Sequence, residues 1–467
     1  MAMGRSKDRQ RGLWIETGKL ARGPGHPFYQ RLNALLAKQG FDAFVEASCQ
    51  KFYAEVMGRP SLPPGVYFRL LLIGYFEGID SERGIAWRVA DSLALREFLD
   101  LELTEGTPDH STISRTRRLM DQETHAEVFT WVVRVLAKQG LLHGKTLAID
   151  ATTLEANAAL RSIVRRDTGE SYQQFLERLA KASGIETPTR EDLARIDRDR
   201  KGKGSNGEWQ HPHDPEARIT KMKDGRTHLA HKAEHVVDLE TGAVVAVTVQ
   251  TTDGGDRASS QATLQEAMDV IADVLEDQQA AAALSPEVFA ELVADKGYHC
   301  NEVLEQQAEL GIRTYISEPR RGKRRWRGKG RAKAAVYANR KRMRGARGKR
   351  LARRRGEFVE RTFAHCYDTG GMRRTHLRGQ ANIRKRAVVH VAAFNLGLVM
   401  RKLVGAGTPR GFAASLRQCF HQLAALARRL RTTMIVWATQ RIGLTQSPGR
   451  CSDRFACHAF STSATAC

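Results

Sequence analysis

The chain has 467 residues, 41% hydrophobic and 27% charged, which is enough for two or three globular domains with real cores. Its formal net charge of +23 favours a polyanionic partner, and nucleic acid is the first to consider. The seven cysteines form no C-x-x-C pair, and no apolar stretch reaches the ~20 residues of a membrane span, which argues against a zinc ribbon, a disulfide framework and a membrane protein.

The N-terminal part, residues 1–135, is predicted to be a helical domain, because its apolar residues recur at helical spacing. Within it, GTPDHSTISRTRRLM (106–120) has helix start signals followed by Arg115, Arg117 and Arg118. Two interpretations stay open. This region is a plain helical bundle, or it is a DNA-binding domain whose last helix contacts phosphates or bases.

The first predicted strand ends on an acid. Its apolar run, Leu147 to Ile149, stops at Asp150. The following segment, about 155–218, is rich in charge, Gly and Ser and has one helical pattern, YQQFLERLAKA. We interpret it as an insertion that is partly helical and partly mobile.

Beyond the insertion, β-rich and helical patterns alternate. A hairpin is expected where two β-rich runs flank DLETG, and an amphipathic helix follows it. A second apolar run, Leu292 to Ala294, again ends on an acid, Asp295, and is followed by a helix and a strand. The order β-β-β-α-β-α-β predicts an α/β domain with a ribonuclease-H-like mixed sheet and flanking helices over residues 136–404. In that topology the first and fourth strands are neighbours, so Asp150 and Asp295 should meet.

The segment 320–355 is strongly basic, with 19 Lys or Arg among 36 residues and no acid. It is either a solvated, flexible arm or a DNA-binding segment, and in both cases it would bind phosphate. Trp326 and Tyr337 are interleaved with the basic residues and suit stacking on unpaired bases. The candidate DNA contacts are Arg115, Arg117, Arg118, Lys296, Arg320, Arg321, Lys323, Trp326, Arg340, Lys341, Arg342, Arg353 and Arg361. Residues 405–467 are expected to form a basic helix and a disordered tail.

The two strand-end aspartates suit phosphoryl transfer on nucleic acid, which uses two divalent cations ~3.5–4 Å apart. Mg²⁺ or Mn²⁺ needs oxygen ligands, and a third acid on a helix crossing the sheet would complete the set. Glu357, Glu360 and Asp368 are the candidates for it. We favour Glu360, because its apolar neighbours in FVERTF should place it near the core.

Other polar groups have simpler interpretations. Asp253 and Asp256 follow the third strand and are interpreted as turn residues, although their position would also allow them to approach the two strand-end acids. His211 and His213 are too closely spaced, in a polar loop, for a good zinc site. The group Cys451, Cys457 and His458 lies in the expected tail.

Three blocks, LAIDATTLEAN, VADKGYHCNE and FVERTFAH, together resemble the acidic blocks of the DDE transposases of bacterial insertion sequences. The resemblance covers residues 28–404 and includes the N-terminal motif PDHSTISR. It implies metal-dependent DNA cleavage and strand transfer, with Asp150, Asp295 and Glu360 as catalytic triad and metal ligands.

The resemblance also implies double-stranded DNA partners, namely terminal inverted repeats and target DNA. A homo-oligomer, at least a dimer, and a cytoplasmic, nucleoid-associated location are expected with them. The Y-R-E-K signature of the family is only partly matched, since Gly356 replaces its arginine and Tyr367 its lysine. Two alternatives therefore stay open: an inactive DNA-binding transposase remnant, and a metal-dependent nuclease that cuts without joining.

Overall fold

A computed structural model of the protein describes residues 25–54, 61–200, 204–222, 225–320, 322 and 324–443. The described residues up to Phe412 form one compact unit, and those from Ala413 onward form a second. The division at about residue 135 therefore stays a prediction, because both sides of it belong to the same unit.

Helices occupy the first part of the compact unit, as expected from the sequence. They are α1 (Pro27–Lys38), α2 (Phe41–Cys49), the 3-10 helix η2 (Gln50–Phe52), α3 (Pro64–Glu77), α4 (Glu82–Ala90), α5 (Leu93–Phe98), α6 (His110–Leu119) and α7 (Gln122–Lys138). The last four begin where the side chain of Ser81, Ser92, Asp109 or Asp121 accepts a hydrogen bond from a backbone N–H of the first turn.

The central sheet has six strands. They are β1 (Thr146–Glu155), β4 (Arg218–Lys221), β5 (Thr227–Asp238), β6 (Val244–Thr251), β7 (Glu291–Ala294) and β8 (Arg313–Ile316). Strand β5 pairs antiparallel with β1 along one edge and with β4 and β6 along the other. Strands β1, β7 and β8 are parallel neighbours. The order β6-β5-β1-β7-β8 is the ribonuclease-H-like order predicted from the sequence, which is thereby confirmed.

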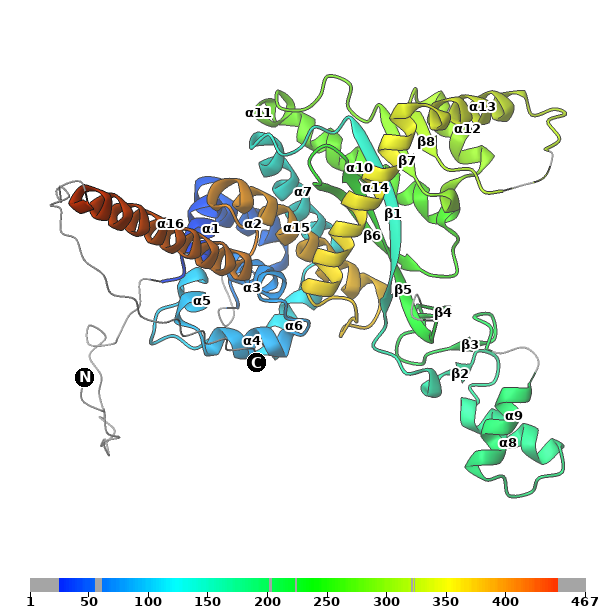
Figure 1. Ribbon diagram of the computed structural model, residues 1–467. Helices are drawn as coiled ribbons and strands as arrows, with labels where there is room; N and C mark the ends of the chain where they lie inside the picture. Colours follow the sequence, from blue (N-terminus) through cyan, green and yellow to red (C-terminus); the bar gives the residue numbers. More distant parts are fainter. Residues whose placement is uncertain are drawn as a thin grey trace, which may run out of the picture. The chain divides into compact units, whose positions relative to one another are not determined.

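Two helices cover opposite faces of this sheet. Helix α10 (Asp256–Glu276) packs on β5 and β6, and α14 (Ala346–Phe363) crosses β1, β5 and β7 (Figure 1). Consecutive residues of β5 point to the two helices: Glu234 is bonded to Ser259 of α10, and His235 to Thr362 of α14. Side chains of the sheet therefore lie against one of two helices, α10 or α14, according to the face on which they point.

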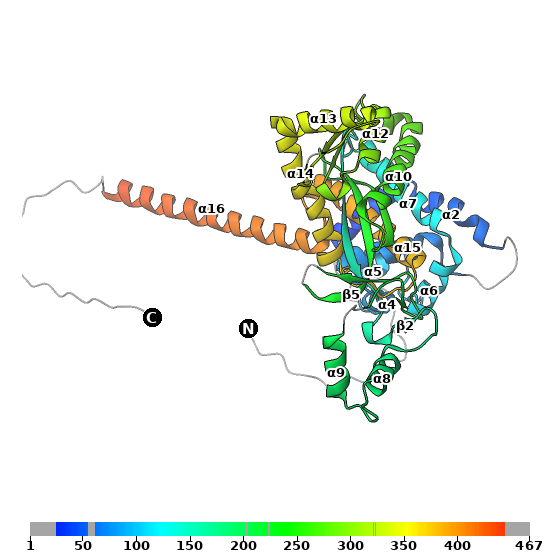
Figure 2. The same cartoon turned by 90° about the vertical axis from the view of Figure 1, so that its right-hand side faces the viewer.

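Further elements of the compact unit follow in the chain. They are α11 (Gln278–Ala281), the 3-10 helix η4 (Lys296–Tyr298), α12 (Asn301–Glu309), α13 (Gly330–Arg344), the π-helix η5 (Ala364–Thr369) and α15 (Gln380–Val404). Of these, α12, α13 and α15 are labelled in Figure 2. Glu266 of α10 pairs with Arg384 of α15 at 2.6 Å. Among the described residues, one helical run, 380–414, is long and apolar enough to cross a membrane. However, 72% of its apolar window is buried inside the protein, as in a core helix.

The insertion after β1 has a small apolar cluster of its own. It contains the 3-10 helix η3 (Leu160–Ser162), β2 (Val164–Arg165), α8 (Tyr172–Ala182), α9 (Arg190–Asp199) and β3 (Trp209–Gln210). Trp209 is 1% exposed and packs with Phe175 and Leu176 of α8. At the other end of the described chain, α16 (Pro409–Gly443) leads into the second unit.

Candidate active site

Two aspartates meet at one edge of the central sheet. The parallel ladder between β1 and β7 ends with the pair Ile149 and Ala294. Asp150 is the next residue of β1, and Asp295 is the first residue after β7, so each carboxylate follows a buried apolar residue. Residues in register on parallel neighbours point to the same face. The structure therefore brings these two sequence-predicted acids together.

Asp150 is a partly buried carboxylate beside an arginine. Its side chain is 23% exposed, and its Oδ2 atom accepts a hydrogen bond from Nη1 of Arg355. Its Oδ1 atom accepts one from the N–H of Ala151 at 2.9 Å. Burial raises the pKa of Asp150, Arg355 opposes this rise, and the nearby charge of Asp295 adds to it. A positive charge at this place therefore stabilises the ionised carboxylate.

Helix α14 and the π-helix after it cover the face on which Asp150 lies. His235, the register partner of Asp150 on β5, contacts the Thr362 hydroxyl at 3.2 Å and the Tyr367 hydroxyl at 2.6 Å. Burial lowers the pKa of His235 to about 3, so the ring is neutral at physiological pH. Tyr367 occupies the position at which the Y-R-E-K signature has lysine. Its hydroxyl contacts His235 of β5 and so connects the π-helix η5 to the sheet.

Among the described residues, Glu360 does not form a metal-binding group with the two aspartates. Its side chain is exposed, contrary to the expectation that its apolar neighbours would place it near the core. Val359, Thr362 and Phe363 are the buried residues of this turn, and Glu360 is turned about 100° from Val359. Glu357, also exposed, pairs with Arg361 at 2.7 Å. In the part of the chain that the structure describes, no three His, Cys, Asp or Glu side chains are grouped to hold a metal ion.

A buried polar network lies on the other face of the sheet, and the sequence interpretation did not include it. Glu234 is 0% exposed, and its carboxylate accepts hydrogen bonds from Tyr298 at 2.8 Å, Ser259 at 2.8 Å and Thr263 at 2.5 Å. Lys232 lies 3.4 Å from the same carboxylate. Tyr298 ends the short turn that starts after Asp295, so the network ties this turn to β5.

One signal for this network was present in the sequence. The β5 segment HKAEHVVD has a lysine and a glutamate two residues apart, so both lie on one face of the strand, and charges buried there must be paired. Lys232 also pairs with Asp256 at 2.6 Å, so Asp256 belongs to this network. Asp253, by contrast, pairs with Arg218 at 2.7 Å in the turn after β6.

Within the basic segment 320–355, residues 330–344 form α13 and residues 346–355 belong to α14. Part of the charge of these two helices is used in bonds to the sheet and to the residues next to it. Arg340 pairs with Glu318 at 2.5 Å. Nε of Arg342 donates to the carbonyl of Thr314 on β8 at 2.8 Å. Both arginines were candidate DNA contacts, and both are half-buried in intramolecular bonds.

Other candidate DNA contacts are exposed. They are Lys296, Arg320, Lys341, Arg353 and Arg361. Arg321 and Lys323 lie outside the described residues.

A cleft beside the turn after β7 gathers basic residues around Trp326. Its volume is about 320 Å³. It is lined by Arg257, Cys300, Asn301, Glu302, Arg324, Arg325, Trp326 and Lys329. The guanidinium of Arg324 lies over the Trp326 ring at 5.5 Å. Basic side chains around an aromatic ring suit a nucleotide, whose phosphate and base need these two groups.

Helix α6 presents two of its three arginines. Arg115 and Arg118 are exposed, and their hydrogen bonds to other residues stay within the helix. Arg117 is buried: its Nε lies 2.7 Å from Glu82, and its Nη1 donates to Asn382 at 2.6 Å. The expectation that Arg117 contacts DNA is therefore wrong, because this side chain joins α6 to α4 and α15.

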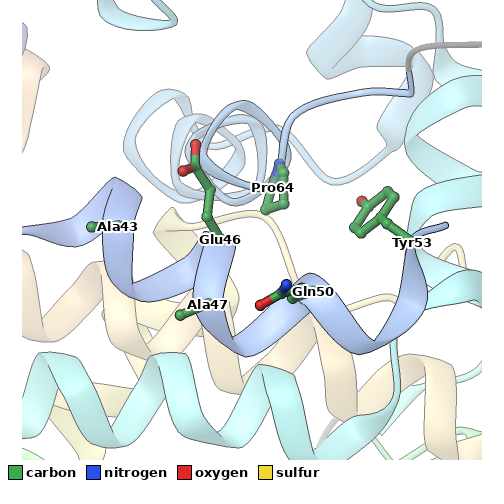
Figure 3. A pocket seen from close by; sticks show the side chains of 6 residues that line it. All are labelled: Ala43, Glu46, Ala47, Gln50, Tyr53 and Pro64. Carbon is green, nitrogen blue, oxygen red and sulfur yellow. The ribbon is translucent and has the colours of Figure 1, made fainter. Parts of the chain in front are cut away.

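A second cavity, of about 470 Å³, lies beside α2. Figure 3 shows its lining side chains, which are Ala43, Glu46, Ala47, Gln50, Tyr53 and Pro64. None of these side chains is basic, and Glu46 is acidic. This cavity therefore does not suit a DNA phosphate.

Comparison with known families supports these observations. A model described as "Transposase DDE domain" matches residues 142–396, more than half of the chain. A model described as "Transposase domain (DUF772)" matches residues 18–119. No curated protein and no solved structure gives a significant match. The chain belongs to the family of transposases with a DDE domain.

Proposed function

We propose that this transposase binds the terminal inverted repeats of an insertion sequence, cuts the DNA there and joins the 3′-hydroxyl ends to target DNA. The reaction uses two Mg²⁺ or Mn²⁺ ions and takes place on nucleoid DNA in the cytoplasm. The observation that carries the proposal is the pair Asp150 and Asp295 at the ends of adjacent parallel strands. A nuclease that cuts without joining and an inactive remnant are the competing functions.

The residues at this edge fit divalent cations. Both aspartates offer hard oxygen ligands. Burial raises the pKa of Asp150, and the charge of Asp295 adds to this rise, so a cation between the two carboxylates would relieve their repulsion. When bound, two such ions activate the attacking water or 3′-hydroxyl and stabilise the leaving 3′-oxygen. Arg355 neutralises Asp150 on the same face and offers its guanidinium to a DNA phosphate there.

We propose Glu360 as the third ligand, supplied when α14 adjusts on the sheet. Relative to the buried Val359, Glu360 is turned by about 100° around the helix axis and Glu357 by about 160°. A smaller rotation of α14 would therefore bring Glu360 to face the sheet. Phe358 lies against Gly242 at the β5–β6 turn, and Glu360 occupies the opposite flank of the helix. Glu357 is in addition engaged with Arg361.

DNA contacts are proposed at two places. The exposed Arg115 and Arg118 of α6 are proposed to read the terminal repeats, since arginine suits paired contacts with guanine. The exposed basic residues of segment 320–355 and the cleft around Trp326 are proposed to hold the strand near the cut. Their contacts are expected mainly with phosphate, because the joining step must accept many target sequences.

One assay separates the three functions. The purified protein is incubated with a labelled terminal-repeat duplex, target DNA and Mg²⁺. A transposase gives cut ends and joined products, a nuclease gives cut ends alone, and a remnant gives neither. Asp150→Asn should abolish both products while DNA binding stays within about twofold. Asp253→Asn is the matched control, because this aspartate is tied to Arg218 and should leave both products unchanged.

A further inference from the structure

Helix α16 exposes a stripe of large apolar side chains. Five of them are more than two-fifths exposed: Leu416 (44%), Phe420 (69%), Leu423 (55%), Leu430 (58%) and Met434 (68%). With Ala427, they are separated by alternating steps of four and three residues. This spacing is a heptad repeat over nearly three heptads.

The repeat places its leucines at one kind of position. Steps of four then three put Leu416, Leu423 and Leu430 at position d, and Phe420, Ala427 and Met434 at position a. Leucine at d packs well in parallel two-stranded coiled coils. We propose that α16 pairs with α16 of a second copy of this chain in a parallel coiled coil. The proposal stands on α16 alone and does not rest on the proposed catalytic residues.

The charges of α16 select the parallel orientation. The helix has six arginines and no acidic residue. Arg417 and Arg431 occupy position e. In an antiparallel pair, position e faces position e of the partner, which sets arginine against arginine. In a parallel pair, Arg431 faces position g, where Leu426 is uncharged and 54% exposed. The arginine stem then covers that leucine.

The test uses the full-length protein without DNA. Light scattering after size exclusion should give about twice the 52.1 kDa chain mass for the natural sequence. The double variant Leu423→Lys/Leu430→Lys should give a single-chain mass. The control Ala425→Lys/Thr432→Lys adds the same charge at position f, on the outer side, and should stay dimeric. A single-chain natural protein, or a Leu423→Lys/Leu430→Lys variant that stays dimeric, would overturn the proposal.

Orientation is tested by cross-linking. Residues 416 and 434 are about 27 Å apart along the helix. A short bismaleimide should link Leu416→Cys to itself, and Met434→Cys to itself, between two chains. The natural sequence, with its own cysteines, gives the background. An antiparallel pair would instead give links only in a mixture of the two variants, and that result would also overturn the proposal.

Discussion

The hydroxyl of Tyr298 should stabilise the fold through its hydrogen bond to a buried carboxylate. Tyr298→Phe removes a 2.8 Å bond to the carboxylate of Glu234, which is fully buried. A hydrogen bond to a charged group contributes about 1.5–3 kcal/mol, because the partner left behind is poorly solvated. Ser259 and Thr263 remain bonded to the carboxylate, so we expect a loss of about 2 kcal/mol in the free energy of unfolding.

Urea unfolding followed by circular dichroism measures this loss. Tyr337→Phe is the matched control, because Tyr337 is 49% exposed and the same change should cost less than about 0.5 kcal/mol. The turn that ends at Tyr298 begins after Asp295, so the variant should also need more Mn²⁺ for half-maximal DNA cutting. If Tyr298→Phe and Tyr337→Phe unfold at the same urea concentration, the hydrogen bond between Tyr298 and Glu234 does not stabilise the turn after Asp295.

Three further predictions concern charges. Arg117→Ala should lower the free energy of unfolding by about 3 kcal/mol, because it breaks the buried ion pair with Glu82. Arg115→Ala should leave the free energy of unfolding unchanged and should weaken binding to terminal repeats in a gel-shift assay. Burial raises the pKa of Glu266 to about 7, so the native protein binds the extra proton and loses stability as the pH rises from about 4.5 to 7. Relative to Glu266→Gln, the natural protein should therefore lose up to about 3 kcal/mol between pH 5 and 8 in urea unfolding, and parallel curves would contradict this. Arg325→Ala/Lys329→Ala should lower the slope of log affinity for DNA against log salt by about 1.8, and an unchanged slope would show that the cleft does not hold phosphate.

The strand-end acids were predictable because two local patterns coincide with one rule of topology. Each apolar run stops on an aspartate, and the element order makes the two strands parallel neighbours. The turn after Asp295 contains Gly297, which lies close to another side chain. A Cβ atom at Gly297 would collide with the carboxylate of Asp256, so a side chain at this position would force that carboxylate to move.

Whether a helical side chain is buried or exposed was harder to predict, because it depends on which side of the helix packs against the rest of the protein. Glu360 directly follows the apolar residues Phe358 and Val359 in the sequence, yet one residue of helix turns it about 100° away from Val359. Arg117 looks like its neighbours Arg115 and Arg118, and only the packing of α6 against α4 and α15 decides that it is buried. The partners of Arg117, Glu82 and Asn382, are distant in the sequence, and no local sequence pattern indicates these contacts.

We propose that Asp150 and Asp295 hold the divalent ions needed to cut and join DNA. Replacing either aspartate by cysteine puts a soft sulfur ligand in place of a hard oxygen, which Mg²⁺ accepts poorly and Mn²⁺ accepts better. We predict that Asp295→Cys gives no cut or joined terminal-repeat DNA in Mg²⁺ and recovers part of both products in Mn²⁺, with DNA binding unchanged. Cutting by Asp295→Cys in Mg²⁺ at the rate of the natural protein would contradict the account.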